Sequence, residues 1–174
     1  VAEGDWAFYD RSKTGAEIAR DFYKLMREET AGMMIIACNV ASHIAAGWID
    51  LNRIADDTSG REWVRTMVMG VHGLAYRLPQ NGIFYMADAD CVGITNDIKW
   101  DKNKQWLDVL AKSGTPVFVS IADDAYTDEI KADIKKCNDT VFLNSGIFPS
   151  LFRAPSGNYN NTVVAAATEL NLPY

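Results

Sequence analysis

Carboxylate side chains follow several apolar segments of this 174-residue chain. Asp56 and Asp57 come directly after the run Trp48–Ile54, while Asp88 and Asp90 end the next apolar run. Carboxylates that gather at one place can bind a divalent cation or transfer protons to and from a polyhydroxylated substrate. Neighbouring residues at a strand end point in different directions, so we expect only one aspartate of the first pair to face a substrate.

Each of these acidic segments ends a hydrophobic run, and a helical pattern follows each run. The four runs are Met33–Asn39, Ile49–Asp57, Ile83–Asp90 and Pro116–Asp124. Strands that alternate with helices predict an α/β fold with parallel βα repeats and right-handed crossovers. Functional groups in such folds gather at the carboxyl ends of the strands. The polar residues expected to meet there are Asn39, Asp56, Asp57, Asp88, Asp90, Asp123 and Asp124.

Helical periodicity is clearest in four segments. The first begins after Thr14, a suitable N-cap, and Gly32 ends it. The second is expected to end near Leu78-Pro79, and its apolar stripe consists of Trp63, Met67, Val71, Leu74 and Ala75. The third covers residues 101–112, with Trp106, Leu107, Val109 and Leu110 expected to face inward and Ser113-Gly114-Thr115-Pro116 as its stop signal, and the fourth covers residues 128–136. Two architectures fit this order, a doubly wound domain and part of a (β/α)8 barrel, which in full has about 250 residues.

Composition excludes several classes of protein. The net charge is −6 and no cluster of Lys and Arg forms a basic face, which argues against binding nucleic acid. No apolar run approaches the roughly 20 residues of a membrane span. The three cysteines are far apart in the sequence, so neither a disulfide framework nor a zinc site is indicated. No glycine-rich nucleotide motif follows any strand.

Structural roles compete with functional ones for most of these residues. Aspartates at strand ends also cap helices. Cys38 is interpreted as a small buried hydrophobe, and His43 and His72 as packing residues on helices. Trp100 lies in an expected loop, where it could stack on a sugar, although packing is the favoured interpretation.

A series of motifs nevertheless runs in order along the chain. They are Cys38-Asn39, Ser42-His43 with Gly47, the segments Arg53–Trp63 and Ala87–Gly93, Trp100, and Ser113–Pro116. Together they resemble the motifs of the α-galactosidase (melibiase) type glycoside hydrolases of families 36 and 27. The resemblance extends from Trp6 to Lys136.

The resemblance implies a retaining hydrolase on a (β/α)8 barrel, with the four strands expected here as strands five to eight. It implies that Asp56 is the catalytic general acid and base, which protonates the leaving oxygen and then activates water. The substrate-binding residues that it implies are Cys38, Asn39, Arg53, Asp57, Asp88 and Asp90. The implied substrate is an α-linked galactoside or related oligosaccharide, and neither a metal nor a cofactor is expected.

The family's nucleophile motif, Lys-x-Asp at a strand end, ends none of the four expected strands. We therefore expect the half of the barrel that carries the nucleophile to lie upstream of Val1. Residues 1–138 then form the carboxyl-terminal half of a catalytic domain, and residues 139–174 form an irregular tail, with one edge strand expected near Val163, or the start of a following domain. The isolated chain is expected to be an inactive fragment of an enzyme of carbohydrate metabolism.

Two other functions remain open. One is a non-catalytic carbohydrate-binding or structural half-barrel that associates with itself through its exposed sheet edges. The other is a metal-dependent phosphotransfer domain of the response-regulator kind, which lacks the expected acidic pair after the first strand. The sequence does not indicate a cellular compartment.

Overall fold

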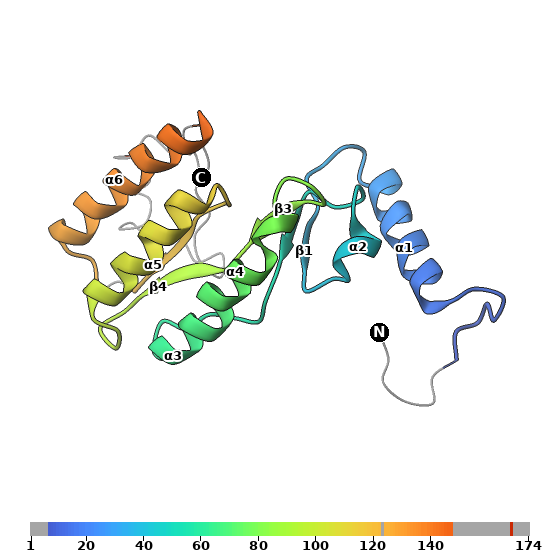
Figure 1. Ribbon diagram of the computed structural model, residues 1–174, viewed down its shortest axis with the longest axis horizontal. Coiled ribbons are helices and arrows are strands. Elements are labelled where there is room, and N and C mark those ends of the chain that lie inside the picture. The colour runs from blue at the N-terminus through green and yellow to red at the C-terminus, as the bar shows by residue number, and fades with distance from the viewer. Residues whose placement is uncertain (1–6, 123, 148–167, 169–174) are drawn as a thin grey trace.

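The computed structural model describes residues 7–122, 124–147 and 168 (Figure 1). Its elements are α1 (Gly15–Glu29), β1 (Ile36–Cys38), α2 (Ser42–Ala45), β2 (Leu51–Arg53), α3 (Trp63–Arg65), the π-helix η1 (Thr66–His72), α4 (Gly73–Arg77), the 3-10 helix η2 (Leu78–Gln80), β3 (Met86–Asp88), β4 (Cys91–Ile94), α5 (Trp100–Ser113), β5 (Phe118–Ile121) and α6 (Asp128–Ser145). The fold is mixed α/β with short parallel sheets, as the alternation of strand and helix patterns predicts.

The strands pair in the order in which they follow one another along the chain. β1, β2 and β3 form one parallel sheet in that order, and β4 and β5 form a second. Only Ala89 and Asp90 separate β3 from β4, so one extended segment pairs first with β2 and then with β5. Asp90 has a φ of 71°, in the left-handed region, which turns the segment between its two partners.

β4 is the strand that the sequence analysis missed, because a loop was expected after Asp90. Val92 and Ile94 are buried while Cys91 and Gly93 are half-buried, which is the alternation of a strand with one covered face. Gly93 is required by a close contact: a Cβ atom there would lie 2.7 Å from the Cα of Gly60. The segment therefore packs directly on the loop that follows β2.

The amino-terminal helix follows its sequence signals closely. The Thr14 hydroxyl accepts a hydrogen bond from the Glu17 amide at 3.3 Å, and the Glu17 carboxylate accepts one from the Thr14 amide at 2.8 Å. This reciprocal capping box satisfies two amides that the helix leaves unpaired. Figure 1 shows α1 and α2 at one end of the molecule and α5 and α6 at the other.

The helical region after β2 is confirmed in position, and its expected stripe is confirmed in part, because Leu74 is in the core and Trp63 and Val71 pack against it. Thr66, Gly70 and Leu74 are buried, whereas Ala75 is exposed. A π-helix has wider turns than an α-helix, so the residues that face the core recur here every fourth position. The expected end of the helix near Leu78-Pro79 is confirmed, since α4 ends at Arg77 with Leu78 as its C-cap. A short 3-10 turn then continues to Gln80, with the proline tolerated in its first turn.

The hydrophobic core lies between the strands and the helices α4, α5 and α6. Trp106 and Leu110 on α5 have no exposed surface, and neither has Val92 on β4. Val109 was expected to face inward but is 41% exposed. α5 ends as predicted, because Gly114 adopts a left-handed φ of 72° that stops the helix.

The carboxyl-terminal part of the described chain is more helical than expected. α6 continues to Ser145 rather than ending at Lys136, so the proposed boundary at residue 138 falls inside a helix. The division into two domains itself stays a prediction. The edge strand expected near Val163 lies outside the described residues, and among the described helices none is sufficiently long and apolar to span a membrane.

Gly70 gives the first testable prediction. A Cβ atom at this position would lie 2.8 Å from Cζ2 of Trp106, which is fully buried, and 3.1 Å from Cγ2 of the half-buried Thr58. We expect Gly70→Ala to lower the free energy of unfolding by about 1–3 kcal/mol through overpacking. Urea denaturation followed by circular dichroism measures this change.

Gly15→Ala is the matched control. A Cβ atom there meets only Cε2 of Phe8 at 3.6 Å, which is an ordinary contact, and alanine favours the helix more than glycine does. We expect no loss of stability in this variant. An equal loss in both variants would show that Gly70 is not packed as described.

Candidate active site

The last residues of three neighbouring strands lie side by side. Cys38 at the end of β1 is paired in register with Arg53 at the end of β2, and Arg53 is paired with Asp88 at the end of β3. In a parallel sheet, residues in register project to the same face. The structure thus brings together three of the residues that the sequence assigned to substrate binding.

Arg53 is the centre of this cluster, because its three guanidinium nitrogens each meet a different carboxylate. Nη2 lies 2.8 Å from Asp90, Nη1 lies 2.9 Å from Asp57, and Nε lies 3.4 Å from Asp88. Only 21% of the Arg53 side chain is exposed. An arginine with all of its nitrogens engaged has little capacity left for a ligand and acts chiefly to hold the three acids.

Asp90 is held from two sides. One of its carboxylate oxygens accepts hydrogen bonds from the Thr58 amide at 2.7 Å and from the Thr58 hydroxyl at 3.0 Å. The Asp90 amide donates to the Asp88 carboxylate at 2.7 Å. The loop that follows β2 is in this way fixed to the turn between β3 and β4.

The two aspartates after β2 are the accessible members of the site. The side chain of Asp57 is 74% exposed and that of Asp56 is 62% exposed. Asp56 accepts hydrogen bonds from the Asp57 amide at 2.8 Å and from Arg65 at 3.2 Å, and Arg65 also binds the Asp57 carbonyl. Asp56 and Asp57 therefore bind different arginines, which agrees with the expectation that the pair points in different directions.

Cys38 and Asn39 extend the site towards α2, and both are exposed. The backbone amide of Asn39 donates to the backbone carbonyl of Arg53 at 3.0 Å, and Asn39 has a left-handed φ of 52°. Asparagine tolerates this conformation better than most residues, which accounts for its place at a strand end. The interpretation of Cys38 as a buried hydrophobe is wrong.

Burial and charge alter the protonation of the cluster. Burial raises the pKa of Asp88, and the hydrogen bond from the Asp90 amide and the nearby Arg53 offset only part of that rise. Burial acts to lower the pKa of Arg53, but the charges of Asp90 and Asp88 outweigh this effect and raise it. Burial also raises the pKa of the Cys91 thiol to about 11, so that this cysteine is a poor nucleophile at neutral pH.

Other residues expected at the site have different environments. Asp124 accepts a hydrogen bond from the Asn96 side chain at 2.9 Å, and Asp123 lies outside the described residues. Trp100 is the first residue of α5 rather than a loop residue, and its indole donates to Asp133 at 2.9 Å; the packing interpretation is therefore the better one. His43 and His72 are exposed, not packed. Among the described residues no three His, Cys, Asp or Glu side chains are placed to hold a metal ion.

Three polar residues that support the site were not expected from the sequence. Thr58 and Arg65 hold Asp90 and Asp56, as described above, and Asn52 is only 1% exposed. The Asn52 side chain accepts a hydrogen bond from the Val40 amide at 3.4 Å, which ties the loop after β1 to β2. A polar residue inside an apolar run was the available signal for Asn52, whereas Arg65 gave none.

Comparison with known proteins gives a family match over the last third of the chain. A family model described as polysaccharide deacetylase matches residues 120–174. The matched segment begins in β5, whose Ser120 and Ile121 pair with Gly93 and Ile94 of β4. No curated protein matches the chain. The match indicates a hydrolase that processes carbohydrate.

This match overturns the resemblance to α-galactosidases, and the assignment as a glycosidase that acts on α-galactosides is corrected accordingly. The broader expectation of a hydrolase with a carbohydrate substrate agrees with it. The structure gives a physical reason for the misleading motifs, because several of their residues are required by the fold alone. Gly47 and Gly114 have left-handed φ angles of 80° and 72°, and Gly93 packs against Gly60.

Arg53 gives the second testable prediction. Replacing it by methionine leaves Asp88 and Asp90 in a largely buried place without a counter-charge, and we expect the free energy of unfolding to fall by about 3 kcal/mol at pH 7. Lys112→Met is the matched control, because its partner Asp108 is 55% exposed and surface pairs contribute less than about 1 kcal/mol.

The loss in Arg53→Met should depend on pH. The pKa of Asp88 in the folded protein lies above its ordinary value of 3.8, so this group favours folding most below that value and less as the pH rises through the folded pKa. Without Arg53 the pKa of Asp88 rises further, and Asp88 needs no counter-charge once it is protonated. Denaturation at pH 7 and pH 4 should show a smaller loss at pH 4; an equal loss would contradict this assignment.

Proposed function

We propose that this chain is a hydrolase that removes acetyl groups from a polysaccharide. The observation that carries this proposal is the family match over residues 120–174. The described structure supports it with a set of carboxylates and hydrogen-bonding groups at the ends of parallel strands, the place where α/β enzymes bind their substrates.

Removal of an acetyl group requires water to add to a carbonyl carbon and a proton to reach the departing sugar oxygen or nitrogen. A positioned carboxylate can take the proton from water and later donate it. Asp56 is the best candidate for this role, since it is well exposed and is held by Arg65 and the Asp57 amide. Its assignment as the catalytic residue is part of this proposal.

The exposed members of the cluster are proposed to bind sugar hydroxyls. Asp57, Asn39 and Cys38 are exposed, and at or after the ends of β1 and β2 they present acceptors and a side-chain amide donor. Arg53, Asp88 and Asp90 were also expected to contact substrate, but they are engaged with one another, and we propose that they position Asp57 and the loop after β2.

A half-barrel is the architecture that we propose for the described strands. Strand order is the observation that favours it, because strands that pair in chain order build a barrel, whereas a doubly wound sheet reverses its order once. Ile36, Met86 and Phe118 lie on the strands and are 55%, 40% and 37% exposed. Apolar side chains on an exposed strand favour association with another surface.

The catalytic proposal is tested by measuring acetate released from O-acetylated and N-acetylated oligosaccharides by the 174-residue chain. We expect acetate release from at least one of these substrate classes and no hydrolysis of an aryl α-galactoside. Asp56→Asn should lower the rate by about 10²–10⁴-fold, the usual contribution of a general acid or base, without changing the thermal unfolding curve.

Asp108→Asn is the control for this experiment, because Asp108 is an exposed carboxylate on α5 whose partner is Lys112. Its rate should equal that of the unaltered chain. Acetate release that is unchanged in Asp56→Asn would remove Asp56 from the mechanism. A folded chain that releases no acetate from any acetylated substrate would refute the proposed activity.

Self-association is tested by light scattering coupled to size-exclusion chromatography. We expect a concentration-dependent dimer or larger species, and we expect Ile36→Lys to shift the population towards the monomer because a charge on β1 opposes strand pairing. Val64→Lys is the control, since Val64 is 66% exposed but lies on α3. A chain that is monomeric at all concentrations would contradict association through the sheet.

A further inference from the structure

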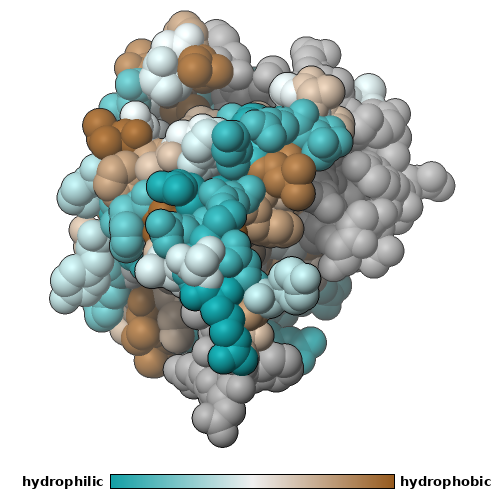
Figure 2. All heavy atoms as spheres, turned by 90° about the vertical axis from the view of Figure 1, so that its right-hand side faces the viewer, coloured by the Kyte–Doolittle hydropathy of each residue, from teal (hydrophilic) through white to brown (hydrophobic). Residues whose placement is uncertain are grey.

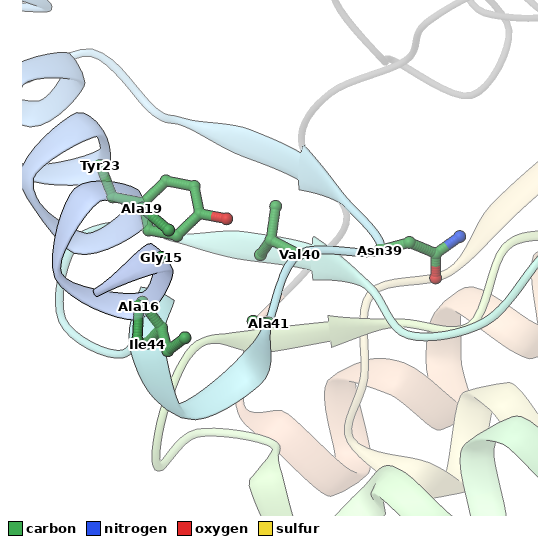
Figure 3. A pocket seen from close by; sticks show the side chains of 8 residues that line it. All are labelled: Gly15, Ala16, Ala19, Tyr23, Asn39, Val40, Ala41 and Ile44. Carbon is green, nitrogen blue, oxygen red and sulfur yellow. The ribbon is translucent and has the colours of Figure 1, made fainter. Parts of the chain in front are cut away.

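A pocket with a volume of about 430 Å³ lies between α1 and the chain that follows β1. Figure 3 shows α1 on one side of the pocket and the segment from Asn39 to α2 on the other. Its lining residues are Gly15, Ala16, Ala19, Tyr23, Asn39, Val40, Ala41 and Ile44. The volume lies within the range of about 300–1,000 Å³ that is usual for small-molecule sites.

Small side chains on both walls keep this space open. Ala16 and Ala19 face it from α1, and Ala41 faces it from the start of α2 (Figure 3). No residue of α1 is fully buried, so the helix packs on the rest of the molecule without filling the gap. Figure 2 views the end of the molecule that carries α1, where apolar patches interrupt a mainly hydrophilic surface.

The chemistry of the lining restricts the ligand. Most lining side chains are aliphatic and none is charged. Tyr23 contributes an aromatic ring that extends towards Val40 in Figure 3, and its hydroxyl has no hydrogen-bond partner among the described residues. Apolar walls with one free hydroxyl suit a neutral aromatic ring that carries a single polar group, because the ring can pack against Tyr23 and the polar group can bond its hydroxyl.

The pocket adjoins the candidate active site. Asn39 lines the end of the pocket away from α1, and its backbone amide donates to the backbone carbonyl of Arg53 at 3.0 Å. A ring bound in the pocket would therefore lie beside the carboxyl ends of β1 and β2. A bare sugar ring would be a poor ligand here, since most of its hydroxyls would find no partner in the aliphatic walls.

We infer that this pocket is a subsite for a neutral phenolic ring attached to the carbohydrate substrate. The link to a carbohydrate rests on the proposed function, whereas the preference for a phenolic ring rests on the pocket alone. The two can fail independently, so they are tested by separate measurements on the same samples.

Binding is measured by titrating the 174-residue chain into 4-methylumbelliferone and following the fluorescence of this phenolic probe. We expect saturable binding, which Ala19→Leu weakens at least tenfold by filling the pocket. Tyr23→Phe, which removes only the hydroxyl, should weaken binding about threefold. Ala132→Leu makes the same change at an exposed position on α6 and should bind as the unaltered chain does.

The absence of saturable binding, or equal binding by Ala19→Leu and the unaltered chain, would overturn the inference. Circular dichroism confirms that each variant is folded; if Ala19→Leu is not, Tyr23→Phe decides, and unchanged binding by it would overturn the role of the hydroxyl. Binding of the probe without acetate release would support the pocket and refute the proposed activity. Acetate release without binding of the probe would support the proposed activity and refute the pocket as a binding site.

Discussion

The guanidinium of Arg53 joins the parts of the candidate site, since it meets carboxylates from three positions in the chain. Asp88 and Asp90 could not remain largely buried and ionised without a positive charge beside them. Arg53 is the last residue of β2, and from this position its side chain reaches Asp57 in the loop that follows β2, Asp88 at the end of β3 and Asp90 in the turn after β3. The arrangement of Asp57 and of the loop that Thr58 ties to Asp90 follows from this single placement.

Much of the fold follows from local signals in the sequence. The four apolar runs, the capping box at Thr14 and the stop at Gly114 each predict an element that the structure contains. β4 was missed because it follows two acids, Asp88 and Asp90, which are typical of a loop, and the second of them has a left-handed φ that turns the chain. The rotated stripe of η1 was missed because the periodicity of an α-helix was assumed where the backbone adopts a π-helix.

The site was predictable in its location but not in the roles of its members. Strand alternation is enough to bring Cys38, Arg53 and Asp88 into one row. Accessibility depends on packing across the molecule, and the sequence could not show that Asp56 and Asp57 are exposed while Asp88 and Asp90 are covered. Residues that the backbone conformation or close packing requires were interpreted as parts of catalytic motifs. This interpretation led to the wrong hydrolase family.

Position 90 accepts few residue types other than aspartate. Its left-handed φ favours glycine, asparagine or aspartate, because other side chains are strained there. Its two partners reduce the choice again, since glycine offers no acceptor to Thr58 and asparagine brings no charge to Arg53. Aspartate is thus the residue type that meets the conformational, hydrogen-bonding and electrostatic demands together. Evolutionary tolerance at this position should be among the lowest in the described chain, even though Asp90 is not proposed to touch the substrate.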